Sequence, residues 1–328
     1  MKNTPNIFSF ATSELCQDEM FAWLIQWASP EFAVADPELH RIGRQFVRIL
    51  TGKDESYLID SIDVGRQWEN IDIWAEINDN TILIVEDKTG STVHDGQLER
   101  YKVSVEREYA GKRTDLCYAY VKTCEEPRSV LARIEQCGYK VVCRQDILEC
   151  LNDYNGTDTL LVSYRNHLQK LDNSVMSYKY LPEKQWDWYA WQGFYKELEK
   201  RVSLESWSYV ANPSGGFLGA WWHFVEVGDC TMYLQFEQGK LCFKISYEGD
   251  EEDRSEVRCR NHIKLLEKSR ERYPEIHRPD RFGSGMYMTI AVVDEEKIFG
   301  DGIVDFISLT SKLKQYETLI DECGDEKE

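Results

Sequence analysis

Apolar and polar positions alternate with two different periods in the first half of the chain. Apolar residues three and four positions apart predict amphipathic helices over residues 14–28 and 37–50. The period then becomes that of β-structure, and three consecutive strands are predicted over residues 57–64, 71–77 and 81–86. The third of these is almost continuously apolar, which is typical of a strand buried on both faces.

The pattern that follows alternates helices with strands. A tight turn at Asn78, Asp79 and Asn80 joins the second and third strands. Further helices are predicted near residues 94–109, 129–136, 147–151 and 159–171, and further strands over residues 116–121 and 139–143. A mixed central sheet flanked by helices, a three-layer α/β fold, is therefore expected for this half.

The second half has a different order of predicted elements. Strands are predicted over residues 207–211, 217–225, 231–237, 240–247 and 287–293, and helices over residues 188–202, 256–273 and 301–320. Mostly consecutive strands, with a turn at Gln238 and Gly239, predict an antiparallel sheet in an α+β domain. The polar stretch after residue 171 places the boundary within residues 172–185, giving domains over residues 1–173 and 174–328.

Composition and charge exclude some classes of protein for this chain. The chain is 42% apolar, which excludes a mostly disordered protein, and its net charge of −19 means that its average surface repels phosphate. Any contact with nucleic acid must therefore use a local basic patch. Residues 206–225 lack charged side chains, but the Pro-Gly turn within them predicts two strands and no membrane span.

Cysteine usage and the first residues predict a cytoplasmic protein. The ten cysteines occur singly, with no C-x-x-C pair to suggest zinc or a redox dithiol. Residues 1–6 lack the apolar segment of a signal peptide. Unpaired cysteines are typical of a reducing compartment.

The candidate chemistry lies at the ends of the second and third strands. A hairpin brings Asp72 to the level of Glu86, and the period of two places Glu86 and Lys88 on one face with Asp87 on the other. Two carboxylates beside an ammonium suit Mg²⁺ or Mn²⁺ and a water to be activated. Taken alone, the same triple also fits solvated strand ends with a surface counter-ion.

The flanking helices add polar residues to this edge of the sheet. Gln97 and Tyr101 are spaced to share one face of the helix after the third strand. Glu14 opens the first helix, and Asp18 lies one turn later on the same face.

These elements together resemble the PD-(D/E)XK nuclease superfamily. Its signature is an acid on the second core strand, (D/E)-x-K on the third, an acid on the preceding helix and, in a branch with RecB-like and Cas4-like nucleases, Q-x-x-x-Y on the next helix. Asp72, Glu86 to Lys88, Glu14 and Gln97 to Tyr101 match these parts in order. The proline of the family name is absent, because Ile71 precedes Asp72.

The resemblance implies a restriction-endonuclease-like core over about residues 1–150 and a role for each matching residue. Asp72 and Glu86 would bind the divalent metal, Mg²⁺ or Mn²⁺, and Lys88 would position or activate the water. Glu14 would bind a second metal or order its waters. Gln97 and Tyr101 would contact the phosphate of the substrate.

Three alternatives stay open at these positions. Asp18 rivals Glu14 as the helical acid, and Gln17 could also reach the site. Asp87 would replace Glu86 if a bulge reversed the phase of the strand. His94 lies in the neighbouring loop and is either a substrate contact or an ordinary surface residue.

The second half offers two weaker signals. Residues 254–281 carry a local charge of +4, so this segment is either a phosphate-contacting patch or a solvated helix face with ion pairs. Six of the ten tryptophans lie in residues 186–222 and would stack on bases or, as we favour, form the core.

The function we expect is a metal-dependent nuclease that acts on DNA in preference to RNA, with phage defence or restriction suggested by family analogy alone. The second domain would select substrate, bind a protein partner or regulate activity, and a homodimer fits cleavage of both strands. One alternative is an inert nucleic-acid-binding or regulatory module of the same fold. Another is an interaction protein whose acidic surface binds a basic partner.

Overall fold

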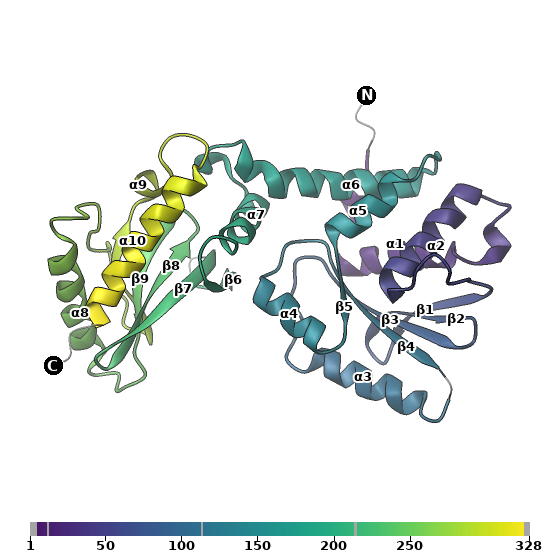
Figure 1. The fold of residues 1–328 in the computed structure, drawn as a ribbon, viewed down its shortest axis with the longest axis horizontal. Helices are drawn as coiled ribbons and strands as arrows, with labels where there is room; N and C mark the ends of the chain where they lie inside the picture. The colour runs from purple at the N-terminus through teal and green to yellow at the C-terminus, as the bar shows by residue number, and fades with distance from the viewer. Residues whose placement is uncertain (1–4, 12, 113, 213–214, 325–328) are drawn as a thin grey trace. The chain divides into compact units, whose positions relative to one another are not determined.

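A computed structural model describes residues 5–11, 13–112, 114–212 and 215–324, so residues 1–4 of the N-terminal segment lie outside it. The chain divides into two compact units (Figure 1). The N-terminal unit comprises Met1–Glu126 and Val130–Asn173, and the C-terminal unit comprises Pro127–Ser129 and Ser174–Glu328.

A five-stranded mixed sheet forms the centre of the N-terminal unit. Its strands, in spatial order, are β1 (Ile62–Trp68), β2 (Ile71–Ile77), β3 (Thr81–Lys88), β4 (Asp115–Lys122) and β5 (Lys140–Cys143). The first three strands are antiparallel, and β3, β4 and β5 are parallel to one another. Every residue of β3 is buried, as its continuous apolar pattern predicts.

Helices cover both faces of this sheet. They are α1 (Glu14–Gln26), α2 (Pro37–Thr51), α3 (Gln97–Glu108), α4 (Arg128–Gln136), α5 (Arg144–Asn152) and α6 (Thr159–Val175), with short 3₁₀ turns at Ile7–Ser9 and Pro30–Phe32. Figure 1 shows α1, α2, α5 and α6 on one face of the sheet and α3 and α4 on the other. Apolar side chains of the first set form one core with the sheet, and those of the second set form another. The predicted three-layer α/β architecture is confirmed.

The first strand differs from its predicted position. It covers Ile62–Trp68 instead of residues 57–64, because an edge strand needs only one buried face and its polar residues broke the sequence pattern. Glu69 and Asn70 adopt the left-handed conformation in the turn to β2. Gly65 is required here, since the ring of Trp74 lies only 2.3 Å from where a Cβ would stand.

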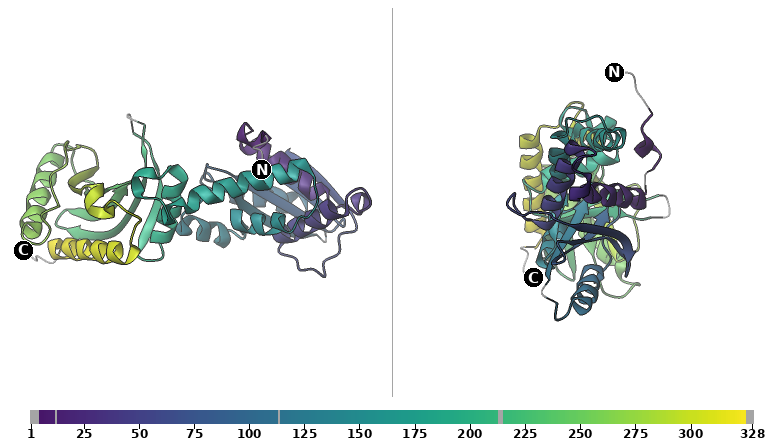
Figure 2. Two further views of the ribbon diagram at one scale, coloured as in Figure 1. Left: turned by 90° about the horizontal axis from the view of Figure 1, so that it is seen from above. Right: turned by 90° about the vertical axis from the view of Figure 1, so that its right-hand side faces the viewer.

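The C-terminal unit contains an entirely antiparallel sheet. Its strands, in spatial order, are β10 (Tyr287–Val293), β9 (Lys240–Ser246), β8 (Cys230–Glu237), β7 (Phe217–Val227) and β6 (Leu204–Val210). Its helices are α7 (Trp188–Leu198), α8 (Arg254–Ser269), α9 (Glu295–Phe299) and α10 (Phe306–Gly324), with 3₁₀ turns at Met176–Lys179 and Glu183–Gln185. These helices contribute to one core with the sheet, and Figure 2 shows α10 (yellow) lying along it.

The last helix begins at Phe306 instead of residue 301, because the short α9 and Gly300, which has a positive φ, precede it. The uncharged stretch forms β6 and β7 as predicted, although Pro213 and Ser214 of the turn lie outside the described residues. No helix in the described part of the chain is long and apolar enough to cross a membrane.

The tryptophans of residues 186–222 serve mainly as core residues. Four of them, Trp186, Trp191, Trp207 and Trp222, are buried in the core of the C-terminal unit. Their large apolar area stabilises this unit and leaves these four rings no free face for a base.

Candidate active site

The sheet register brings the two predicted strand acids together. Ile73 of β2 pairs with Val85 of β3, so Asp72 and Glu86 are the next residues along the two strands at the same level. The side chain of Glu86 is fully buried, whereas that of Asp72 is one-quarter exposed. The acids therefore meet where the sheet begins to open to solvent.

Lys88 lies among three carboxylates. Its Nζ is 2.6 Å from Oε1 of Glu86, 3.6 Å from Oδ2 of Asp72 and 4.0 Å from Oε2 of Glu14. Glu86 and Lys88 thus share one face of β3, as the period of two predicts. The helical acid and both strand acids face the same ammonium.

Burial and charge shift the protonation equilibria of this group. Burial, reinforced by the negative charge of Asp72, raises the pKa of Glu86 to about 8. Burial disfavours the ammonium of Lys88, but the ion pairs with Glu86, Asp72 and Glu14 outweigh it and raise its pKa. The carboxylates therefore hold Lys88 as a cation.

Helix α3 directs Gln97 and Tyr101, its two predicted site residues, toward the cluster around Lys88 and Glu86. Nε2 of Gln97 is 2.6 Å from Oε1 of Glu86 and donates a hydrogen bond of 2.9 Å to the hydroxyl of Tyr101. Burial raises the pKa of Tyr101, so its hydroxyl keeps its proton. His94 is exposed, and it is its backbone amide that bonds to Gln97, at 3.1 Å.

Glu14 is held by the loop that follows β3. Its Oε1 accepts hydrogen bonds from the backbone amide of Thr89 at 3.1 Å and from the hydroxyl of Ser91. Burial opposes its ionisation, but the bond from Ser91 and the charge of Lys88 outweigh burial and lower its pKa. Glu14 is therefore a fixed carboxylate at the edge of the cluster.

Asp87 points to the opposite face of β3, against α1. Nε2 of Gln17 donates to both of its carboxylate oxygens, at 2.8 and 3.0 Å. Burial and the neighbouring carboxyl of Asp18 raise the pKa of Asp87 well above its usual range. The register of β3 is continuous, so Asp87 does not take the place of Glu86 beside Lys88.

Asp18 of α1 lies between the cluster around Lys88 and the buried Asp87. Burial and the charge of Asp72 raise its pKa to about 6, and its side chain also contacts Asp87. Its Oδ1 is buried and has no hydrogen-bond partner among the described residues. Glu14 and Asp18 therefore both face the cluster.

A protein-family model describing the PD-(D/E)XK nuclease superfamily matches residues 5–179 of this chain. The match covers more than half of the sequence and includes all the elements just described. The chain belongs to the PD-(D/E)XK nuclease superfamily. The mixed five-stranded sheet with its flanking helices is the restriction-endonuclease-like core of that superfamily. Searches of curated proteins and of solved structures found no match.

Sequence reasoning missed a second lysine beside this nuclease-superfamily cluster. Lys122 pairs with Lys88 in the parallel β3–β4 ladder and is buried. Its Nζ donates to the backbone carbonyl of Ser91, whose hydroxyl bonds to Glu14, and lies 4.0 Å from Oε1 of Glu126. The available signal was a lysine directly after the apolar run of β4, level with Lys88.

The donor set of this cluster fits a divalent cation. Oε2 of Glu86 is buried without a hydrogen-bond partner among the described residues, as is Oδ1 of Asp18. Carboxylate oxygens are the ligands that Mg²⁺ and Mn²⁺ prefer, and these two come from β3 and α1. As the described side chains stand, no three His, Cys, Asp or Glu residues already converge in the geometry of a metal site.

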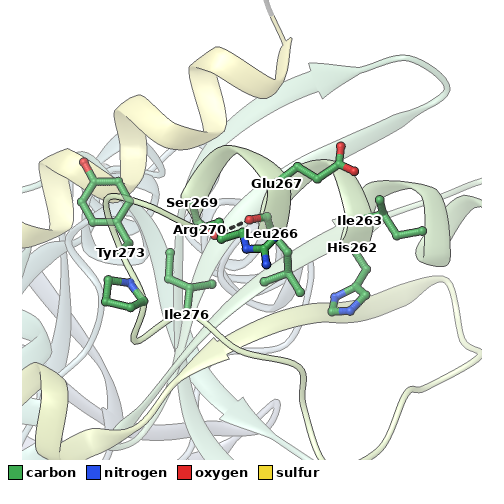
Figure 3. Close-up of a pocket in the computed structure, with 9 residues that line it drawn as sticks. His262, Ile263, Leu266, Glu267, Ser269, Arg270, Tyr273 and Ile276 are labelled. Atoms are coloured by element: carbon green, nitrogen blue, oxygen red, sulfur yellow. Dashed lines mark hydrogen bonds between the residues drawn. The ribbon is translucent and has the colours of Figure 1, made fainter.

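A pocket of about 520 Å³ lies elsewhere, in the C-terminal unit. It is formed by α8 and the segment after it, and Figure 3 shows His262 and Tyr273 at its opposite ends. None of the six predicted site residues lines it. The candidate active site is therefore the polar cluster of the superfamily core.

Proposed function

We propose that this protein is a nuclease that hydrolyses phosphodiester bonds of DNA with Mg²⁺ or Mn²⁺. The observation that carries this proposal is the convergence of Asp72, Glu86 and Glu14 on the ammonium of Lys88. Gln97 and Tyr101 adjoin the same cluster, and their arrangement supports the branch with the Q-x-x-x-Y motif. We place the protein in the cytoplasm, in restriction or phage defence.

The proposed chemistry assigns a task to each side chain. Asp72 and Glu86 would hold the divalent cation, with Glu14 orienting its waters or a second ion. A bound ion supplies Lewis-acid charge and lowers the pKa of a coordinated water. The Lys88 ammonium stabilises negative charge on the phosphoryl oxygens, because its neighbours keep it protonated. Gln97 and Tyr101 donate hydrogen bonds that orient the phosphate.

We assign the C-terminal unit to substrate selection, partner binding or regulation, with a homodimer as the form that cuts both strands. An inert binding module is the competing function. Buried carboxylate oxygens that lack a hydrogen-bond partner among the described residues are costly to keep unless they bind a ligand, which favours an active site over an inert fold.

The direct test uses linear, circular and single-stranded DNA together with RNA. Purified protein is incubated with each substrate in Mg²⁺ or Mn²⁺, and products are followed on gels. We expect cleavage of DNA that is lost in Asp72→Asn and kept in Asp63→Asn, an exposed acid on β1 that serves as the matched control. Wild-type protein that cuts no substrate under either metal would favour the inert module.

Metal binding is expected to stabilise the protein against heat. An ion that binds only the folded state contributes about 2.7 kcal/mol when its concentration is 100 times its Kd. Mg²⁺ or Mn²⁺ should therefore raise the Tm of the wild type, measured by differential scanning fluorimetry. The rise should vanish in Asp72→Asn and persist in Asp63→Asn, and equal shifts in all three proteins would place the ion elsewhere.

The two helical acids are expected to differ in their effect on cleavage. Glu14 contacts the loop beside Lys88, whereas Asp18 contacts the buried Asp87. Glu14→Gln should therefore slow cleavage by about 10- to 100-fold, the range seen for groups that orient metal ligands. Asp18→Asn should slow it less, and single-turnover rates at saturating metal decide the order. The reverse order would make Asp18 the helical acid.

A further inference from the structure

Arg258 of α8 is a buried cation without an acidic partner among the described residues. The residue is 9% exposed, and no carboxylate of the described residues forms an ion pair with it. Its two terminal nitrogens donate to the carbonyl of Gly283 and to the hydroxyl of Ser255 at 2.9 Å. Its Nε is buried without any acceptor among the described residues. A buried charge without a counter-ion is costly, so the site favours an anion.

Two guanidinium groups of this region contact one aromatic ring, that of Phe282. The guanidinium carbons of Arg258 and Arg278 lie 4.7 and 4.6 Å from the ring centroid of Phe282. The imidazole of His262 packs edge-on against the same ring, with centroids 5.1 Å apart. Arg278 is exposed and has no carboxylate partner among the described residues. Phe282 therefore contacts two guanidinium groups.

Other arginines of the same segment are already neutralised. Arg254 pairs with Glu251, Arg260 with Asp229, and Arg272 with Glu322. The local charge of +4 in residues 254–281 is thus unevenly distributed. The uncompensated part includes the Arg258–Phe282–Arg278 cluster.

We propose that the Arg258–Phe282–Arg278 cluster binds a phosphate group of a nucleic-acid backbone, as a contact separate from the residues that cleave it. Exposed Arg278 supplies the direct contact, because a planar guanidinium matches the oxygens of a phosphate. Buried Arg258 adds to the positive potential at the same ring. The choice of nucleic acid rests on the proposed function, since that is the substrate of a nuclease.

The test measures binding without cleavage. The full-length protein is mixed with a fluorescein-labelled oligonucleotide in EDTA, and fluorescence anisotropy gives Kd over a series of KCl concentrations. Arg278→Gln should weaken binding by about tenfold at low salt. It should also reduce the slope of log K against log salt by about one, because one phosphate contact is lost. Arg272→Gln is the matched control, since Glu322 already neutralises that charge.

Further measurements distinguish a nucleic-acid phosphate from free inorganic phosphate and identify variants that fail to fold. Arg278→Lys keeps the charge and should keep the salt slope. Inorganic phosphate should compete only weakly, and phosphate that binds as tightly as the oligonucleotide would assign the site to the free ion and overturn the proposal. Arg258→Gln is read only if its Tm matches the wild type, and it should also weaken binding.

The outcome is independent of nuclease activity. Equal binding by Arg278→Gln, Arg272→Gln and the wild type would overturn the proposal even if the wild type cleaves DNA. Weakened binding by Arg278→Gln alone would support it even if the wild type cleaves nothing, in which case only the proposed nuclease function fails.

Discussion

Replacing Lys88 with alanine is expected to lower the rate of DNA cleavage by about 100- to 1,000-fold, the usual effect of removing one donor that stabilises transition-state charge. Lys88 is the only cation within 4.0 Å of Asp72, Glu86 and Glu14 in the described part of the chain. Single-turnover cleavage at saturating metal measures the effect, with the exposed Lys112→Ala as the matched control.

The same variant separates catalysis from metal binding. Without the ammonium, Asp72, Glu86 and Glu14 repel one another more strongly, which favours a bound divalent cation. Metal should therefore still raise the Tm of Lys88→Ala while cleavage is lost. A variant that cleaves at the wild-type rate would show that Lys88 takes no part in the reaction.

The cluster could be predicted from sequence because it depends on local periods. Hairpin register places Asp72 level with Glu86, and the period of two places Lys88 beside Glu86. The spacing of four brings Gln97 to Tyr101 within a hydrogen bond. Each of these relations needs only one strand pair or one helix turn, so the sequence was sufficient.

The hydrogen bonds that hold the cluster's side chains in place could not be predicted, because they join residues far apart in the chain. Gln17 bonds to Asp87, and Ser91 bonds to Glu14, only once α1 has packed on the sheet. The buried Lys122 likewise depends on the parallel pairing of β3 with β4. Periodicity reports which face of an element is buried, but it does not report which polar groups meet there.

The same limit applies to the basic segment of the C-terminal unit. This segment contains nine basic and five acidic residues, and the sequence does not show which of them form ion pairs. The acids that neutralise Arg260 and Arg272 are Asp229 and Glu322, which lie outside that segment. Counting charge along the chain therefore misses which arginines keep an uncompensated charge.

Replacing Arg144 with leucine is expected to destabilise the N-terminal unit by about 3–5 kcal/mol, the usual result of removing one partner of a buried ion pair. Arg144 is 1% exposed, and its Nη2 lies 2.6 Å from Oε1 of Glu125. Its Nη1 donates to the carbonyl of Thr123 at 2.6 Å, and its Nε lies 3.1 Å from Asp172. Leucine removes these contacts together and leaves the charge of Glu125 buried.

The loss should be measurable in the N-terminal unit itself. Native-state hydrogen exchange at the amides of β4 reports the free energy of opening of that strand. The neighbouring, exposed Gln145→Ala is the matched control, and a change below about 1 kcal/mol in Arg144→Leu would contradict a structural role for the pair. The double variant Arg144→Leu/Glu125→Leu should recover part of the loss, because it removes the buried charge of Glu125 together with that of Arg144. The backbone amide of Thr123 bonds to the carbonyl of Lys88 at 3.2 Å. Local unfolding around Arg144 should therefore also destabilise the end of β3 that carries Lys88 and the candidate active site.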